Sequence, residues 1–152
     1  GAAAVFLAEE EWAQKNDWPA LARLVDSEVA ASDYVTGREG LLLAPVRAIP
    51  TILERNSLGL DDFDFIEIHE AFASTVLAQI SELERTGVGK VDRSKLNVNG
   101  SSLAAGHPFA ATGGRIVASL AKMLADRGAG SKGLISICAA GGQGVVAILE
   151  AC

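Results

Sequence analysis

Two short apolar segments separated by a glycine-rich turn close this chain, and they restrict its fold more than any other feature. Gly133–Cys138 and Gly144–Glu150 are rich in Leu, Ile and Val, which is typical of buried strands. The residues between them are too few for a helix, so the two strands are expected to form an antiparallel pair. A helical stripe of apolar residues precedes them over Arg115–Arg127 and ends at Gly128. This order predicts helices packed on a sheet.

Strand and helix patterns also alternate in the first half of the chain. Three further segments are predicted as strands, namely Ala2–Ala8, Leu21–Ala31 and Phe63–Ile68. Three are predicted as helices, namely Glu9–Asn16, Pro45–Asn56 and Glu70–Leu83. The pattern at Leu21–Ala31 also fits a helix, and Pro50 predicts a kink or a late start in its helix. The fold class is therefore α/β, with a mixed five-stranded sheet and helices on both faces.

Composition limits the class of protein. A chain of 152 residues is expected to form one domain over residues 1–152. The net charge of -6 and the lack of a Lys/Arg run disfavour nucleic acid as a partner. Two cysteines do not make a secreted disulfide framework, so a reducing, cytoplasmic setting is predicted. No apolar run reaches the roughly 18 to 20 residues of a membrane span.

One histidine and one cysteine lie in glycine- and alanine-rich segments that core packing does not require. His107 lies in NVNGSSLAAGHPFAATGGR, and Cys138 lies in ICAAGGQG. The second histidine, His69, follows an apolar strand in EIHEAFAS. Since the chain has only two histidines and two cysteines, this concentration indicates a functional site.

Each feature also has a structural interpretation. A histidine at a strand end, such as His69, is often a hydrogen-bonded structural residue, and an isolated cysteine such as Cys138 is commonly a small buried hydrophobe. The glycines of Gly106–Gly114 could instead form a phosphate cradle at a helix start, although no GxxxxGK[ST] or GxGxxG motif follows a strand. The acidic cluster Asp61–Asp64 lacks the spacing of a calcium loop, so no metal is predicted.

The three unusual segments resemble the sequence motifs of thiolases. NVNGSSLAAGHPFAATGGR is similar to the signature Asn-x-x-Gly-Gly-x-x-Ala-x-Gly-His-Pro-x-Gly-Ala-[Thr/Ser]-Gly-x-Arg, and ICAAGGQG resembles the final Cys-x-Gly-Gly-Gly-x-Gly loop. EIHEAFA looks like the Asn-Glu-Ala-Phe-Ala motif with histidine in place of asparagine, as in the thiolase subunits of fatty-acid β-oxidation complexes. The resemblance covers nearly the whole chain but only the C-terminal half of a thiolase, and it implies a thiolase-like half-domain.

The resemblance implies the chemistry of a 3-ketoacyl-CoA thiolase, an acyltransferase that cleaves 3-ketoacyl-CoA with free CoA or runs the reverse Claisen condensation. His107 is expected to activate a nucleophilic cysteine of the absent N-terminal half. Cys138 is expected to carry a proton to and from the substrate, for which a thiol that titrates near neutrality is suited. His69 would hold a water or donate to the enolate oxygen. All three side chains are expected to line one pocket.

The resemblance places five more residues around that pocket. Backbone N–H groups of Ala140 and Gly141 would belong to an oxyanion hole, and Ala140 stands where glycine is commoner, which leaves its geometry open. Glu70 would orient neighbouring groups, and Phe72 would shape the pocket floor. Gly106 is expected at the pocket because it directly precedes His107.

Partners also follow from the resemblance. They are acyl-CoA and CoA as substrates without a further cofactor, the N-terminal thiolase domain, a second copy of the chain, and a hydratase/dehydrogenase subunit. Because Cys138 and Cys152 lie outside the nucleophile's motif, the 152-residue chain alone is expected to be inactive. The alternatives are a non-catalytic fragment that self-associates through an apolar face, and half of a related condensing enzyme such as a sterol-carrier thiolase. Ketoacyl synthases usually have no cysteine in the role of Cys138, which disfavours them.

Overall fold

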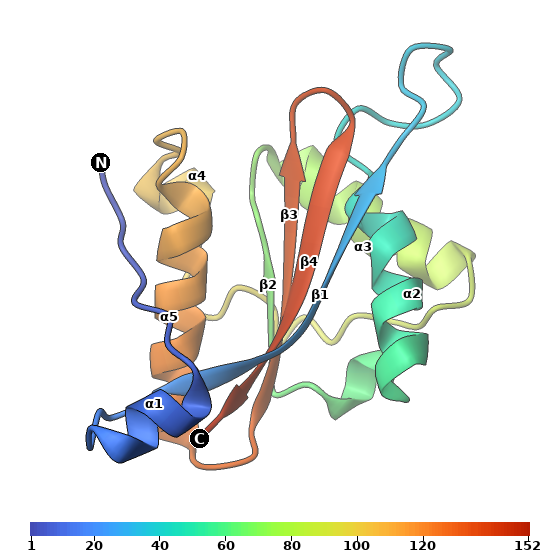
Figure 1. The fold of residues 1–152 in the computed structure, drawn as a ribbon. Helices are drawn as coiled ribbons and strands as arrows, with labels where there is room; N and C mark the ends of the chain where they lie inside the picture. The colour runs from blue at the N-terminus through green and yellow to red at the C-terminus, as the bar shows by residue number, and fades with distance from the viewer.

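The computed structural model describes all 152 residues and forms three layers, with one sheet between two layers of helices (Figure 1). The four strands are β1 (Ala22–Ala31), β2 (Phe65–Ile68), β3 (Lys132–Ala139) and β4 (Gln143–Ala151). Their order in the sheet is β1-β4-β3-β2. β4 pairs antiparallel with β1 and β3, and β2 pairs parallel with β3. The mixed sheet and the antiparallel final pair are confirmed, and the fifth strand is wrong.

The segment Ala2–Ala8, predicted as that fifth strand, lies outside the sheet. It runs alongside the long helix before β3 (Figure 1). A strand is stabilised by hydrogen bonds to a neighbouring strand, and none lies beside this segment, so its apolar sequence does not form one. Phe6 is 65% exposed, and its ring packs against those of Trp12 and Trp18.

The helices lie near their expected positions. They are α1 (Glu10–Lys15), α2 (Pro45–Asn56), α3 (Ala73–Arg85), α4 (Ser102–Ala105) and α5 (Thr112–Arg127), with a 3-10 turn at Leu60–Asp62. α2 continues through Pro50, which lies on its exposed side. α3 begins later than expected because Phe72 has an extended backbone, with φ −148°. None of these helices has the length and hydrophobicity needed to cross a membrane.

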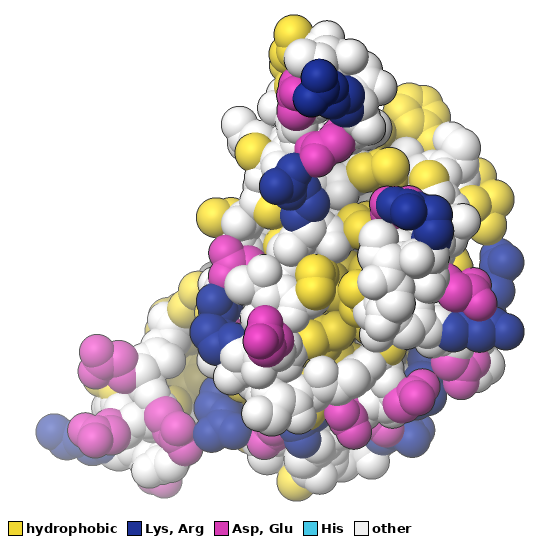
Figure 2. Space-filling model, turned by 90° about the vertical axis from the view of Figure 1, so that its right-hand side faces the viewer, with side chains coloured by type: hydrophobic (Ala, Val, Ile, Leu, Met, Phe, Trp, Pro, Cys, Tyr) yellow, Lys and Arg dark blue, Asp and Glu magenta, His cyan; other side chains and the backbone are white.

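Helices cover both faces of the sheet, as expected. Side chains alternate along a strand, so β3 directs Leu134 into the core under α2 and α3, and Ile135 into the core under α5. A Cβ on Gly133 would lie 2.6 Å from Leu120, so this glycine allows α5 to pack closely on β3. The face formed by α2 and α3 carries apolar patches between basic and acidic side chains (Figure 2).

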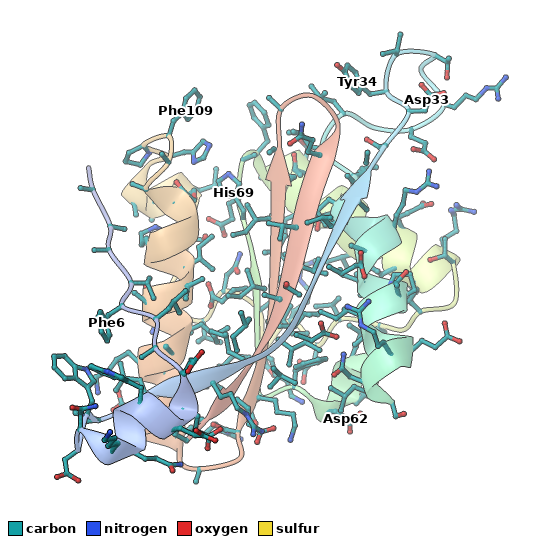
Figure 3. All side chains as sticks on the ribbon, viewed as in Figure 1. Phe6, Asp33, Tyr34, Asp62, His69 and Phe109 are labelled. Carbon is teal, nitrogen blue, oxygen red and sulfur yellow. The ribbon has the colours of Figure 1, made fainter.

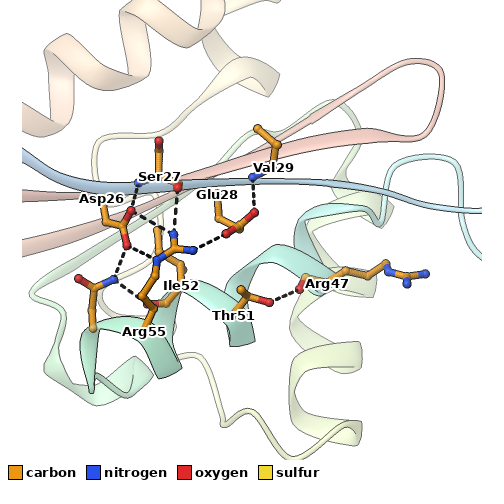
Figure 4. Close-up of polar contacts among 9 residues, drawn as sticks. Asp26, Ser27, Glu28, Val29, Arg47, Thr51, Ile52 and Arg55 are labelled. Carbon is orange, nitrogen blue, oxygen red and sulfur yellow. Dashed lines mark hydrogen bonds and ion pairs between the residues drawn. The ribbon is translucent and has the colours of Figure 1, made fainter.

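An ion-pair cluster attaches α2 to the edge strand β1 (Figure 4). Arg55 donates from Nε to Asp26 Oδ2 at 2.7 Å and from Nη1 to Glu28 Oε2 at 2.6 Å. Arg55 and Asn56 together lower the pKa of Asp26 to about 2. The cluster therefore holds the edge strand β1 against α2.

Candidate active site

The two histidines are in contact. Their ring centroids lie 4.3 Å apart, and their planes are inclined by 47°. His69 follows β2 and is 1% exposed, whereas His107 lies on the surface between α4 and α5. Figure 3 places His69 at the same end of the molecule as Phe109, beside α4 and the start of α5. The structure therefore brings together two of the three residues to which the sequence assigns catalysis.

Cys138 lies at the same edge of the sheet. β2 and β3 are parallel with Ile68 opposite Ser136, and the His69 N–H donates to the Ser136 carbonyl at 2.8 Å. Cys138 follows two residues later on β3, at the carboxyl edge where α/β proteins assemble their sites. Its side chain shares the face of Ser136, which hydrogen-bonds Gln79 of α3 at 2.8 Å. No hydrogen bond joins Cys138 to either histidine.

The Cys138 thiol is buried, with 5% of the residue exposed. Burial raises its pKa above the ordinary value, and no cationic side chain nearby offsets the effect. This direction is opposite to that of the expected thiol, which would titrate near neutrality, and the catalytic role of Cys138 stays a prediction. A raised pKa keeps the thiol protonated, and a protonated thiol can donate a proton to the substrate, which is one of the two steps expected of Cys138.

His69 is held by a buried hydroxyl group. Its Nδ1 lies 2.9 Å from Ser102 Oγ, and that oxygen accepts a hydrogen bond from Arg115 Nη2 at 3.1 Å. Its Nε2 is buried without a partner. Burial, followed by the charges of His107 and Arg115, lowers the pKa of His69 to about 4, so the ring is neutral at physiological pH.

His107 is held by a second hydroxyl group. Its Nδ1 lies 2.6 Å from Thr112 Oγ1, and the Thr112 hydroxyl donates to the Pro108 carbonyl at 3.3 Å. The ring also contacts that of Phe109, with centroids 5.1 Å apart. Gly106 ends α4 with φ +82°, a conformation that favours glycine and turns the chain into the histidine loop.

Glu70 links the end of β2 to α4. Its carboxylate accepts hydrogen bonds from Asn97 Nδ2 at 3.1 Å and from the Leu103 N–H at 3.0 Å. Asn97 in turn bonds both backbone groups of Ile68 at 2.9 Å. These contacts orient the segment that carries Ser102. Phe72 is 63% exposed at the start of α3, and its place in the pocket stays a prediction.

The turn between β3 and β4 accommodates its alanine without strain. Ala139 pairs with Gln143, which leaves a three-residue turn. Left-handed φ angles occur at Gly141 (+86°) and Gly142 (+71°) but not at Ala140. Neither Ala140 nor Gly141 donates its N–H to another backbone group. Their place in an oxyanion hole stays a prediction.

A cavity of about 330 Å³ lies beside this site, between the start of α5 and the segment before α4. Glu67 and Arg115 line it, and Glu67 Oε1 and Arg115 Nε are buried there without hydrogen-bond partners. Burial raises the pKa of Glu67 to about 7, although the charge of Arg115 opposes the shift. No group of His, Cys, Asp and Glu side chains is arranged to hold a metal ion.

Glu67→Gln should flatten the pH dependence of stability between pH 4.5 and about 7. The raised pKa makes the folded chain bind more protons than the unfolded chain in this window, so the free energy of unfolding falls as the pH rises, by at most about 1.4 kcal/mol per pH unit. The amide cannot ionise and removes this slope. Urea unfolding across the window measures it, with the exposed Glu54→Gln as control. An unchanged slope in Glu67→Gln would contradict the burial effect.

Sequence reasoning gave no role to three residues of the site. Ser102, Thr112 and Arg115 hold the histidines, yet in the sequence they are ordinary polar residues of the histidine segment. Thr112 and Arg115 occupy specified positions of the motif that this segment resembles, and this match could have indicated that they belong to the site. Their partners become evident only when α4 and α5 are placed beside β2.

Comparison with known proteins agrees with the motifs. A family model described as the C-terminal domain of thiolase matches residues 18–151. The 3-ketoacyl-CoA thiolase of Alteromonas mediterranea is 39% identical over 161 aligned residues, which cover 99% of this chain and 36% of that protein. The chain thus spans about a third of the length of this relative.

Two solved structures have the same fold over nearly all of the chain. Human mitochondrial 3-ketoacyl-CoA thiolase, also solved in complex with CoA, matches with a TM-score of 0.82 and 36% identity, covering 95% of this chain and 34% of its own. The dimeric peroxisomal thiolase of Saccharomyces cerevisiae matches with a TM-score of 0.81 and 31% identity, at the same two coverages.

Proposed function

This chain belongs to the thiolase family as a C-terminal domain, and we propose that it supplies half of the active site of a 3-ketoacyl-CoA thiolase. The observation that carries the proposal is the contact between the rings of His69 and His107, 4.3 Å apart, at the sheet edge where β3 delivers Cys138. The site would transfer an acyl group between a cysteine thioester and CoA, with CoA as a substrate.

Each residue has a step in thiolysis. His107 takes the proton of a nucleophilic cysteine from the N-terminal domain, and the resulting thiolate attacks the keto carbon of the substrate. The carbon–carbon bond breaks, the leaving acetyl-CoA enolate takes a proton from Cys138, and an acyl-enzyme remains. The Cys138 thiolate then removes the proton of incoming CoA, whose sulfur attacks the thioester and releases acyl-CoA. The nucleophilic cysteine leaves as a thiolate and takes its proton back from His107. His69 donates to the oxyanion that forms at the substrate.

Partners and setting belong to the same proposal. The chain would work with an N-terminal thiolase domain, as a homo-oligomer, and with a hydratase/dehydrogenase subunit in fatty-acid β-oxidation. The yeast relative is described as dimeric, which supports the oligomer. The cytoplasmic location stays a prediction, since the two structural relatives are a mitochondrial and a peroxisomal enzyme.

The test joins this chain to the N-terminal two-thirds of the Alteromonas mediterranea relative and follows acetoacetyl-CoA loss in the presence of CoA. The joined protein should turn over, and the 152-residue chain alone should be inert because it lacks a nucleophile to acylate. Turnover by the purified chain alone, verified by intact mass, would contradict the division of roles.

A non-catalytic fragment that self-associates is the second candidate. Several apolar side chains are largely exposed, among them Phe6 (65%), Val35 (82%) and Phe109 (86%). Contact with another surface would remove them from water, which favours association. Sedimentation of the chain alone and of the joined protein separates the two functions. A joined protein that sediments like the chain's own oligomers and shows no turnover would favour the fragment.

A further inference from the structure

We propose that two hydroxyl groups hold the two histidines in opposite neutral tautomers. Ser102 leaves His69 with its proton on Nε2, and Thr112 leaves His107 with a bare Nε2. The catalytic use of this arrangement rests on the proposed function, whereas the tautomers themselves follow from the hydrogen bonds alone. Ser102, Thr112 and Arg115 are positioning residues, since each acts through another side chain.

The His69 tautomer follows from the partners of Ser102. Arg115 carries only donors, so Ser102 Oγ accepts its Nη2 hydrogen bond at 3.1 Å. The hydroxyl hydrogen of Ser102 then has one acceptor within reach, His69 Nδ1 at 2.9 Å. If Nδ1 carried the ring proton, this hydrogen and the Nε2 lone pair would both be buried without a partner, whereas the other tautomer leaves only the Nε2–H unpaired. Ser102 therefore donates to Nδ1, and the proton of the neutral ring lies on Nε2.

The free Nε2–H of His69 is a donor that the fold leaves unused. His69 is 1% exposed, and Nε2 has no partner in the chain. A buried donor without an acceptor is costly, so its presence indicates an acceptor that arrives from outside. Because burial lowers the pKa of His69 to about 4, the ring does not become a cation at physiological pH and keeps this single arrangement.

The His107 tautomer follows from the partners of Thr112. The Thr112 hydroxyl uses its hydrogen on the Pro108 carbonyl at 3.3 Å, so its oxygen is left to accept. It accepts from His107 Nδ1, 2.6 Å away. In the neutral ring the proton therefore lies on Nδ1, and Nε2 has a free lone pair. His107 Nε2 can therefore accept a proton, whereas His69 Nε2–H can donate a hydrogen bond.

The two tautomers divide acid and base functions between neighbouring rings. The ring centroids are 4.3 Å apart, so a bound thioester meets a hydrogen-bond donor on His69 and a proton acceptor on His107, which becomes a cation only when it takes the proton. Arg115 presents only donors to Ser102, so the direction of this hydrogen bond is fixed. A donor that is already oriented stabilises an oxyanion better than one that must first turn.

Long-range ¹H–¹⁵N NMR of the ¹⁵N-labelled 152-residue chain tests the proposal, because it shows which ring nitrogen carries the proton. Spectra are recorded about two pH units above the ordinary histidine pKa of ~6.5. His69→Gln assigns the two sets of signals. The expected result is protonated Nε2 in His69 and protonated Nδ1 in His107.

Variants then separate the two hydroxyl groups. Ser102→Ala should lower the ratio of the Nε2–H to the Nδ1–H form of His69 roughly fivefold or more, as the loss of one hydrogen bond predicts, and leave His107 unchanged. Thr112→Val should shift His107 alone. Ser102→Thr and Thr112→Ser keep a hydroxyl and should restore each ratio. Ser101→Ala is the matched control, since Ser101 Oγ lies 3.5 Å from Arg115 and bonds neither histidine.

The same tautomer in both wild-type histidines would overturn the proposal, and so would an unchanged His69 ratio in folded Ser102→Ala. If Ser102→Ala does not fold, the wild-type spectrum and the Ser102→Thr variant still decide. The measurement contains no turnover, so its failure leaves the activity test of the proposed function standing. Opposite tautomers in a joined protein without thiolase activity would instead contradict only the proposed function.

Discussion

Cys138→Ala is expected to reduce the thiolysis of acetoacetyl-CoA more than about 100-fold in a protein that joins this chain to an N-terminal thiolase domain. This factor is the lower end of what a positioned acid–base group contributes to catalysis. Without the thiol, the leaving enolate has no proton donor, and incoming CoA has no base. His107→Ala should cause a loss of similar size, because the nucleophilic cysteine then keeps its proton. Steady-state loss of acetoacetyl-CoA, followed in the presence of CoA, measures both.

Cys152→Ala is the matched control for this prediction. Cys152 is exposed and follows β4, outside the turn that carries Cys138, so its loss should leave turnover unchanged. Circular dichroism verifies that Cys138→Ala, which alters a buried position, is folded. Retained thiolysis in folded Cys138→Ala, or its loss in Cys152→Ala, would contradict the assignment of Cys138.

Gly144→Ala is expected to destabilise the chain by about 1 to 3 kcal/mol, the usual cost of overpacking. A Cβ at this position would lie 2.5 Å from the Pro45 ring and 2.6 Å from its backbone nitrogen. Because Pro45 begins α2, the clash is relieved only by moving a helix or the β3–β4 turn. Gly144 pairs with Cys138, so the same variant should also impair thiolysis in the joined protein.

Gly113→Ala is the control, and it is expected to stabilise the chain instead of destabilising it. Gly113 lies in the first turn of α5, where a Cβ would make an ordinary contact of 3.8 Å with Ile137. Alanine is the better helix former, so this variant should gain roughly 0.5 to 1 kcal/mol. Urea unfolding at constant pH gives both values, and equal stability of the two variants would show that the contact with Pro45 is not restrictive.

The regular elements were predictable where one pattern was dominant. β3, β4 and α5 combine clear apolar periodicity with glycines at their ends, and the sequence locates all three. α4 was not predictable, because four helical residues inside a glycine- and alanine-rich segment give no periodic signal. The segment Ala2–Ala8 shows the converse error, since apolar residues predict a strand only if a partner strand is present.

The candidate site was predictable as a set of residues but not as an arrangement. The motifs identified His69, His107 and Cys138, and β-sheet topology explains why they gather at one edge. The contact between the histidines depends on the backbone turn at Gly106 and on the Glu70 bridge, which together place α4 beside β2, and no local sequence pattern specifies that placement. The direction of the Cys138 pKa shift depends on the burial of the thiol, which a motif does not encode.

The position of β4 inside the sheet determines when the fold can form during synthesis. β1 is translated before the other three strands of the sheet, yet its only partner strand is β4, with Ala22 opposite Ala151. Contacts between residues so far apart in the sequence form late, because a long loop must close first. A ribosome-bound chain that stops before Gln143 therefore exposes β1 without a partner, together with the apolar faces of α2 and α5. Such a nascent chain presents the unpaired strand edges on which aggregation begins, so a holding chaperone would be of most use to it before the last strand emerges.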